Sequence, residues 1–331
     1  MKKNTPPQKK RFRLVIVIIL SYIVFVPLTA NGQSRADKVN MVKDQSGRKI
    51  VVDKPYQRII SLYGAHTENL FSLGLDKEII GVSRHESYPA QALTKPVYSY
   101  HDDPEKFMAA RPDLVLVRPM IDRGHPQFVT QLENSGIAVV SLQPATVSEM
   151  YEYWKILGVL TGRQTQAHDM VLRFQNISSK FEALGSSIAV KKKVYFESIH
   201  SKMKTFSPDS MAIFALETAG GINVAGDAKP VRNTNIARYG KERILSHAAQ
   251  IDVYLAQSGA MNRPTVSMIK AEPGFNVIKA VDNDQICSIE VQLVSRPSLR
   301  LLERSPEIGK LLYPDVFNEK ASKLLIQKLS A

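Results

Sequence analysis

Hydrophobic and polar positions follow two alternating periods along the first half of the chain. Short apolar runs suited to buried strands occur at Arg58–Leu62, Ile79–Val82, Val115–Val117 and Ala138–Leu142. Between the last two runs, residues 126–136 place hydrophobic side chains three and four positions apart, which is the helical spacing. Strands that alternate with helices in this way predict a parallel sheet with helices on its faces.

Turn-forming residues mark the first boundaries. The stretch Asp44–Gly47 (Asp-Gln-Ser-Gly) predicts a hairpin ahead of the first apolar strand. After that strand we expect a helix over 67–73, with Thr67 as its N-cap and Gly74 ending it.

The middle of the chain has a different pattern, with helical periodicity and no strand signal. Residues 147–186 carry apolar faces that are interrupted at Gly158 and Gly162, which predicts two helices, the second of them long. We expect this pair to bridge an N-terminal lobe at 33–146 and a C-terminal lobe at 187–331.

Strand and helix signals alternate again in the C-terminal lobe. We expect strands at Val194–Glu197, Val253–Ala256 and 285–289, and a helix at Ser210–Gly220 that Ser207 caps. The predicted fold class is therefore α/β, with two Rossmann-like lobes built on parallel sheets and joined by a long bridging helix.

One short pattern occurs once in each lobe. In the N-terminal lobe Glu105 opens a short helix, and a strand follows at Asp113–Val117. In the C-terminal lobe Glu242 opens a short helix, and a strand follows at Asp252–Ala256. The helix dipole favours a carboxylate in the first turn by about 0.3–1 kcal/mol, which is reason enough for a single acid. Its occurrence in both lobes suggests a shared role.

Composition fits a globular protein of two domains. The chain has 331 residues, of which 44% are hydrophobic and 23% charged. The net charge is +13, but six positive charges and no acid lie in residues 1–32, which leaves +7 for the remainder. The Lys191–Lys193 triplet is the only basic run outside that segment, so we expect no nucleic-acid partner.

The six positive charges in residues 1–32 belong to a recognisable N-terminal pattern. Basic residues precede the fifteen-residue apolar run Leu14–Leu28, and small and polar residues follow it. This order predicts a secretory signal peptide at 1–32. The run is short for a membrane span, so a retained anchor is the alternative. The single cysteine, Cys287, lies far away and has no disulfide partner, so a lipid anchor after the leader is not available. A diffusing periplasmic protein fits best.

Four motifs in order carry a resemblance to a known family. They are "RIISLYGAHTENLFSLGLDKEIIGVS", "PEKFMAARPDLVLV", "GIAVVSL" and "PSLRLLERSPEIGKLLYPDVF". Across residues 44–317 the chain resembles the periplasmic substrate-binding proteins of ABC importers for iron–siderophores, haem and vitamin B12. The resemblance implies that one exposed glutamate from each lobe meets arginines of an inner-membrane ABC permease. The matching positions are Glu105 and Glu242. We expect a monomer in the periplasm.

The resemblance also places the ligand between the lobes, at loops that leave the strand ends. The candidate ligand contacts on such loops are Tyr63, His66, Tyr100, His101, His200, Tyr239 and Arg296. Tyr98 competes with Tyr100 for the same place. Aromatic faces beside cations suit a flat, anionic metal chelate. Corrinoid, ferric siderophore and haem all remain open, and the chelate is transported cargo rather than a cofactor.

A haem-binding receptor is an alternative within the transport class. Two other classes of protein compete with it: an exported enzyme such as a chelatase, which would need catalytic residues, and a membrane-tethered structural or sensor domain, which would need the leader retained. The sequence contains no Gly-x-Ser-x-Gly, and its histidines form no His-x-x-x-His pattern. We therefore expect no catalytic residues and no dedicated site for a bare metal ion.

Overall fold

The structure is a computed structural model that describes residues 1, 4, 40–232, 234–259, 262–290 and 295–318. The chain divides into Met1–Lys38 and Val39–Ala331, and the fold below belongs to the second unit. The predicted signal peptide lies, except for residues 1 and 4, outside the described residues. In the described part of the chain, no helix has the length and apolar content needed to cross a membrane.

The N-terminal lobe opens with the predicted hairpin. Strands β1 (Asn40–Lys43) and β2 (Lys49–Val52) pair antiparallel. The turn between them is held by the buried Asp44 carboxylate, whose Oδ1 accepts from the amides of Ser46 at 3.0 Å and Arg48 at 2.8 Å. An aspartate that bonds to amides two and four positions ahead fixes such a turn.

A five-stranded parallel sheet forms the centre of this lobe, as predicted. Its strands are β3 (Ile59–Ser61), β4 (Ile79–Ser83), β5 (Val97–Tyr98), β6 (Leu114–Val117) and β7 (Ala138–Ser141). Their order is β5-β4-β3-β6-β7, and every pair is parallel. The chain leaves β3 toward β4 on one side, and later continues through β6 to β7 on the other. The switch point of the sheet therefore lies between β3 and β6.

Helices cover both faces of this sheet. They are α1 (Gly64–Ser72), η1 (Ala90–Thr94), α2 (Pro104–Ala110), α3 (Pro119–Gly124) and α4 (Pro126–Asn134). The prediction that Thr67 caps α1 was wrong. The helix begins at Gly64, one turn earlier, and the Thr67 hydroxyl bonds instead to Ser61 Oγ at 2.8 Å. In α2 the Asp103 side chain accepts from the Glu105 amide, so this helix does have a side-chain cap.

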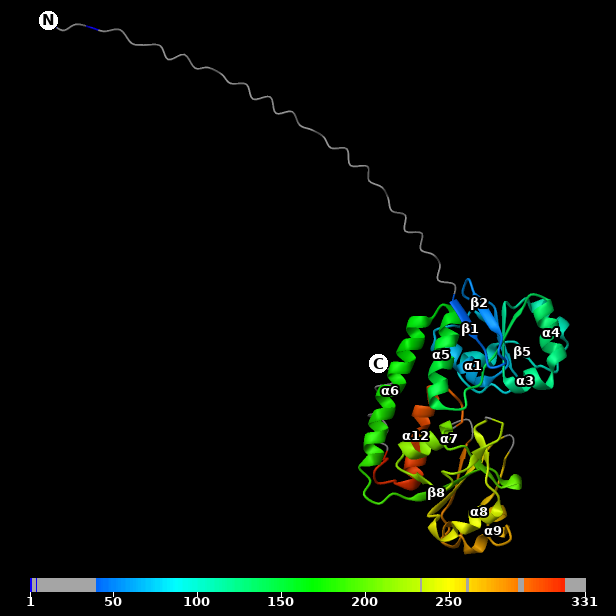
Figure 1. Ribbon diagram of the computed structural model, residues 1–331, viewed down its shortest axis with the longest axis vertical. Coiled ribbons are helices and arrows are strands. Elements are labelled where there is room, and N and C mark those ends of the chain that lie inside the picture. Colours follow the sequence, from blue (N-terminus) through cyan, green and yellow to red (C-terminus); the bar gives the residue numbers. More distant parts are fainter. Residues whose placement is uncertain (2–3, 5–39, 233, 260–261, 291–294, 319–331) are drawn as a thin grey trace. The chain divides into compact units, whose positions relative to one another are not determined.

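The two predicted bridging helices are α5 (Val147–Thr161) and α6 (Gln164–Ser186). Gly162 ends α5 in the left-handed region at a φ of +69°, where a side chain is disfavoured. Gly158 lies inside α5 and lets α6 approach, because a Cβ there would lie 2.7 Å from the Ala167 Cβ. Helix α6 runs alongside both lobes (Figure 1).

The sheet of the C-terminal lobe is mixed rather than purely parallel. Its strands are β8 (Lys193–Ile199), β9 (Lys204–Phe206), β10 (Ile222–Asn223), β11 (Lys229–Pro230), β12 (Ile236–Arg238), β13 (Val253–Ser258) and β14 (Ile286–Glu290). Strands β10, β8, β13 and β14 are parallel, whereas β9, β12 and β11 run antiparallel to their neighbours. The tight turn η2 (His200–Lys202), closed by Met203 at a φ of +45°, returns the chain directly beside β8.

Helices also surround the C-terminal sheet. They are α7 (Met211–Thr218), α8 (Lys241–Ser246), η3 (Ala248–Gln250), α9 (Val266–Ala271), η4 (Phe275–Val277), α10 (Lys279–Asp282) and α12 (Arg300–Leu312). The prediction that Ser207 caps α7 was wrong, because the Ser210 hydroxyl accepts from the Ile213 amide at 3.3 Å.

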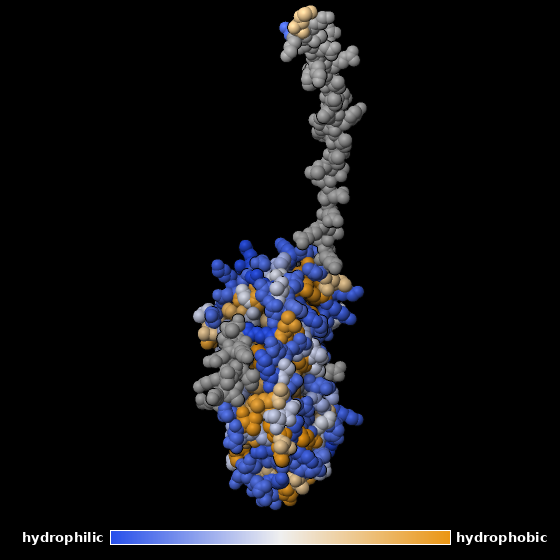
Figure 2. Space-filling model, turned by 90° about the vertical axis from the view of Figure 1, so that its left-hand side faces the viewer, coloured by the Kyte–Doolittle hydropathy of each residue, from blue (hydrophilic) through white to orange (hydrophobic). Residues whose placement is uncertain are grey.

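One hydrophobic cluster passes through both lobes and the bridge. It joins residues of the two sheets to α5, α6, α7 and α12. Trp154 of α5 packs edge-on to Phe174 of α6, whose ring stacks on Phe214 of α7 at 5.8 Å. Outside this core the surface seen from the α6 side is mainly hydrophilic, with hydrophobic residues interspersed (Figure 2). Because the lobes share a core, the bridge is a packed element rather than a free linker.

Candidate ligand-binding site

Two side chains meet at the switch point of the N-terminal sheet. Tyr63 follows β3, and Arg118 directly follows the neighbouring strand β6. The Arg118 guanidinium lies over the Tyr63 ring, with its carbon 4.6 Å from the ring centre. Burial raises the pKa of Tyr63, so the phenol stays neutral at physiological pH. The parallel topology thus brings an aromatic face and a cation together at the sheet's carboxyl edge.

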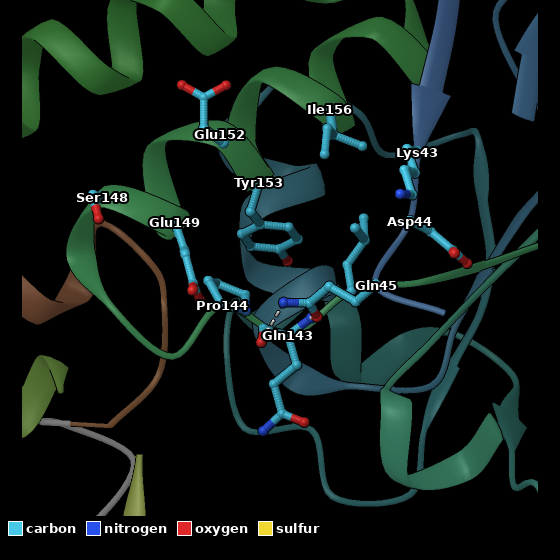
Figure 3. Close-up of a pocket in the computed structure, with 11 residues that line it drawn as sticks. Lys43, Asp44, Gln45, Gln143, Pro144, Ser148, Glu149, Glu152, Tyr153 and Ile156 are labelled. Atoms are coloured by element: carbon cyan, nitrogen blue, oxygen red, sulfur yellow. Dashed lines mark hydrogen bonds between the residues drawn. The ribbon is translucent and has the colours of Figure 1, made fainter. Parts of the chain in front are cut away.

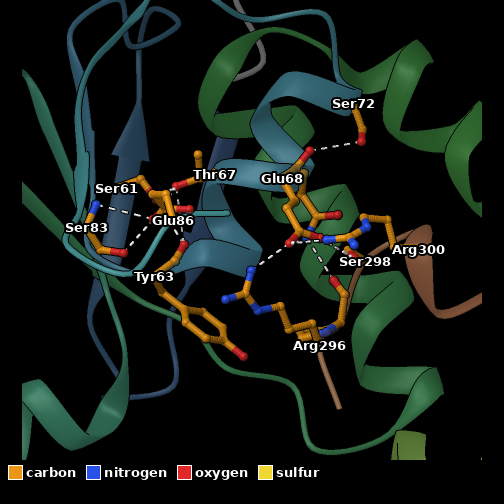
Figure 4. A network of polar contacts seen from close by, with 12 residues as sticks. Ser61, Tyr63, Thr67, Glu68, Ser72, Ser83, Glu86, Arg296, Ser298 and Arg300 are labelled. Atoms are coloured by element: carbon orange, nitrogen blue, oxygen red, sulfur yellow. Dashed lines mark hydrogen bonds and ion pairs between the residues drawn. The ribbon is translucent and has the colours of Figure 1, made fainter. Parts of the chain in front are cut away.

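A buried carboxylate beside this pair connects the two lobes. Glu68 of α1 is 2% exposed. One carboxylate oxygen is 2.6 Å from Arg296 Nη1 and 3.2 Å from Arg300 Nη1, and the other accepts from the Ser298 hydroxyl at 2.7 Å (Figure 4). All three partners come from the segment that leads into α12 in the C-terminal lobe. A buried charge needs such partners, because an unpaired carboxylate there would cost several kcal/mol.

The position of Arg296 accounts for Gly64 at the start of α1. A Cβ on residue 64 would lie 2.7 Å from Arg296 Nη1 and 2.9 Å from the guanidinium carbon. Glycine therefore makes room for the guanidinium where it reaches across to Glu68.

His66 of α1 is buried in the N-terminal lobe, where protein groups occupy both of its ring nitrogens. The ring is fully buried, with Nε2 at 3.1 Å from the Val117 carbonyl and Nδ1 at 2.7 Å from the Tyr153 hydroxyl. Since a carbonyl only accepts, Nε2–H donates to it and Nδ1 accepts from Tyr153. Burial lowers the pKa of His66 to about 3. Both ring nitrogens are used to hold α1 and α5 against β6, and ligand contact by His66 stays a prediction.

Two further hydrogen bonds complete the contact between the lobes. The Asn69 amide donates to the Pro297 carbonyl at 2.8 Å, and the Trp154 indole N–H donates to the same oxygen at 3.4 Å. The segment 295–300 therefore docks on both α1 and α5.

Tyr100 and His101 form a ring cluster with His125 beyond the end of β5. The Tyr100 ring centre is 4.2 Å from that of His101 and 4.7 Å from that of His125, and the two imidazoles are 5.1 Å apart. His101 is exposed and Tyr100 is half-buried. Tyr98 instead packs on Phe107 inside the lobe. This leaves Tyr100 as the better candidate of the two tyrosines.

In the C-terminal lobe His200 follows β8 and is largely buried. Its Nδ1 is 2.7 Å from Glu197 Oε2, and this hydrogen bond raises the pKa of His200. The Tyr254 hydroxyl donates to the same buried oxygen. Tyr239 is also buried, where its hydroxyl reaches the Val224 carbonyl and Arg243 covers its ring. Ligand contact by His200 stays a prediction, whereas Tyr239 is packed within its own lobe.

Two pockets lie in the N-terminal lobe, away from the switch point. The first, of about 320 Å³, lies between the hairpin and α5, and Lys43, Glu149, Glu152 and Tyr153 are among its lining residues (Figure 3). Its two glutamates make it a poor place for an anionic chelate. The second, of about 310 Å³, lies between α2 and α4, and Glu105 lines it.

A bare metal ion has no evident place in the described residues. No group of three or more His, Cys, Asp or Glu side chains converges within that part of the chain. The Cys287 thiol lies within β14 at intermediate exposure, and burial raises its pKa.

Arg118 and Glu68 were not among the residues predicted for the site. Arg118 stands directly after an apolar strand, as does Tyr63, but only the strand order reveals that these two strands are neighbours. Glu68 follows a threonine at the start of a helix, where an acid needs no special reason. Its partners are more than 200 positions away, and no local pattern could have indicated them.

Two α/β lobes that share a helical bridge, with cationic and aromatic groups at a switch point between them, define a two-lobed solute-binding protein. Residues 59–293 match the family described as periplasmic binding protein, and the chain belongs to that family.

Relatives and solved structures agree with this assignment. The chain is 24% identical to an uncharacterized ABC transporter substrate-binding lipoprotein, YvrC, of Bacillus subtilis, over 84% of this chain and 87% of that protein. It is 24% identical to the vitamin B12-binding protein of Vibrio cholerae, over 77% of this chain and 88% of that one. A possible iron-binding, periplasmic solute-binding protein from Staphylococcus epidermidis has a similar structure, with a TM-score of 0.69 and 28% identity. That alignment covers 78% of this chain and all of the other.

Proposed function

We propose that this protein is the periplasmic substrate-binding component of an ABC importer, and that it carries a metal chelate to an inner-membrane permease. The observation that carries the proposal is the meeting of Tyr63, Arg118 and Arg296 where the two lobes join, in a chain of this family. The proposal assigns the chain binding and delivery, with no catalytic step, and treats it as a monomer.

A corrinoid is the first candidate cargo. The vitamin B12-binding protein of Vibrio cholerae aligns with most of the chain, and aromatic and cationic groups suit a large amphipathic chelate. Haem is the alternative that one observation favours. His101 and His125 lie 5.1 Å apart, and their ring nitrogens have no hydrogen bond to any described residue, so either imidazole is free to ligate iron.

Docking on the permease is proposed for the two acids that open matching helices. Glu105 in α2 and Glu242 in α8 are both exposed, and neither forms an ion pair with a described residue. The 310 Å³ hollow beside Glu105 offers space for a side chain of a partner. Arginine would suit both positions, because guanidinium–carboxylate pairs fix orientation as well as attract.

Absorption titration of the processed protein tests the cargo. Cobalamin, haemin and ferric chelates are added separately, and we expect one class to bind with a dissociation constant near or below about 1 μM. A shifted Soret band would identify haem, and loss of water from aquocobalamin would identify a corrinoid. If none of the chelates binds at about 100-fold higher concentration, the proposal is wrong. Mass spectrometry of the same sample shows whether residues 1–32 have been removed.

A further inference from the structure

We propose that Tyr63, Arg118 and Arg296 form an oxyanion subsite, which holds a carboxylate or phosphate group carried by the cargo. The inference rests on the proposed function for the identity of the cargo. It goes further, because it names the chemical group that the cargo must present and the residues that recognise it.

Arg118 is the first observation. Its guanidinium makes a cation–π contact with Tyr63, and among the described residues no carboxylate pairs with it. Its Nε is buried and has no hydrogen-bond partner among the described residues. A buried donor without a partner costs about 1–3 kcal/mol, so a ligand group that accepts from it would be favoured.

Arg296 is the second observation, and it comes from the other lobe. Glu68 engages Nη1, and no described residue accepts from its Nη2 or Nε. The Glu68 carboxylate thus holds the Arg296 guanidinium against Gly64. The Nη2 and Nε donors of Arg296 remain available near Tyr63 (Figure 4). A planar guanidinium with a fixed orientation suits two-point recognition of an oxyanion.

Local charge favours an anion at this place. Two guanidinium groups, those of Arg296 and Arg300, pair with the buried carboxylate of Glu68, and a third, that of Arg118, lies over the Tyr63 ring. The other nearby acid is Glu86, and burial raises its pKa, which brings it closer to the neutral form. Even with Glu86 ionised, the positive groups outnumber the negative ones by one.

The start of α1 adds to the same field. The helix begins at Gly64, right beside the Arg296 guanidinium, and no side chain caps its N-terminus. The positive end of a nine-residue helix therefore lies beside the Arg296 guanidinium and next to Tyr63, its N-cap residue. An oxyanion bound there would interact with both lobes at once, through Arg118 on one side and Arg296 on the other.

Paired ligands, one with and one without an oxyanion, test the subsite and identify its source. Haemin is compared with its dimethyl ester, ferric citrate with the hydroxamate ferrioxamine, and cobalamin with cobinamide, which lacks the phosphodiester together with the rest of the nucleotide loop. Each is titrated into wild type, Arg118→Gln, Arg118→Lys and Arg173→Gln. Arg173 is exposed on α6 and serves as the control for the loss of one positive charge.

We expect Arg118→Gln to weaken the oxyanion-bearing member of the recognised pair by about 10- to 100-fold, the range for a charge-assisted hydrogen bond. The partner without the oxyanion should change less than about twofold, and Arg118→Lys should recover part of the loss. A difference in the haemin or citrate pair would identify the recognised group as a carboxylate, and a difference in the cobalamin pair would identify it as a phosphate. Equal loss on both members, or no loss on either, overturns the subsite. Thermal unfolding of each variant checks that the fold is intact.

The subsite can fail or succeed independently of the cargo proposal. If wild type binds no chelate, calorimetry with citrate and with pyrophosphate probes the subsite directly. We then expect weak binding of one anion that Arg118→Gln abolishes and Arg173→Gln preserves. Absence of binding by both anions would overturn the inference, whereas binding of an anion without any chelate would overturn only the proposed cargo.

Discussion

At the scale of single residues, a buried histidine makes the stability of the fold depend on pH. His66 donates to one partner and accepts from another, so only its neutral form fits. Its pKa is lowered from 6.5 to about 3 by burial. The neutral ring therefore stabilises the fold fully above pH 6.5, where the unfolded chain is also neutral. That stabilisation is lost as pH falls from there toward 3, because the unfolded chain takes up the proton first.

Replacing His66 with Gln should remove this pH dependence. Between about pH 7.5 and about pH 4.5, the wild type should lose about 3 kcal/mol more of its unfolding free energy than the variant does. Urea denaturation at both pH values measures the difference. His168→Gln, at an exposed position on α6, should behave like the wild type. An equal loss in wild type and His66→Gln would show that the ring titrates normally in the folded protein.

At the scale of elements, α1 is tied to the segment that begins α12. The Glu68 carboxylate has three partners on that segment and almost no exposed surface. Removal of its charge would leave Arg296 and Arg300, both only slightly exposed, without their counter-charge. The carboxylate therefore contributes more than a surface ion pair does.

Glu68→Gln should lower the unfolding free energy by about 3 kcal/mol, within the range for breaking a buried pair. The exposed acid Glu152 pairs with Lys155 on α5, and Glu152→Gln should cost less than about 0.5 kcal/mol. Urea denaturation compares the two variants. A double-mutant cycle with Arg296→Met then isolates the coupling. Equal small losses for both glutamates would mean that the contact between the lobes is solvated in solution.

Elements were predictable where one local signal decides them, and unpredictable where distant residues do. The apolar runs at 58–62 and 115–117 became β3 and β6, because a strand buried on both faces must be continuously apolar. The cap of α1 was misplaced, since Gly64 is set by a guanidinium from the other lobe rather than by neighbours in sequence. Arg118 and Glu68 could not be predicted for the same reason, because their neighbours at the site are distant in sequence.

At the scale of the whole protein, the shared core should restrict movement of the lobes. Helix α6 packs on α5, α7 and α12, and one hydrophobic cluster includes all four. We expect closure on ligand binding to be a rotation of a few degrees, in contrast to large hinge closure. Small-angle scattering of empty and loaded protein measures it. A rotation of tens of degrees would show that the bridge bends.

Docking on the permease should be separable from ligand binding. Glu105→Arg and Glu242→Arg change exposed residues, so ligand affinity and stability should stay nearly the same. Uptake through the cognate permease should fall for each and be abolished for the double variant, because arginine facing arginine is repelled. Reconstituted transport is measured beside ligand binding, with Glu182→Arg on α6 as the control. Normal transport by the double variant would show that the two acids do not dock on the permease and only favour the starts of their helices.

The contact between Glu68 and residues 296–300 also sets an order of events during synthesis. The partners of the Glu68 carboxylate lie 228 to 232 positions later in the chain, so they are synthesised long after it. The contacts of His66 with Val117 and Tyr153 can form earlier, but the Glu68 carboxylate has no partner on this segment until nearly the whole chain has been made. If residues 1–32 direct export as predicted, the chain would cross the membrane before this last contact of the N-terminal lobe has formed.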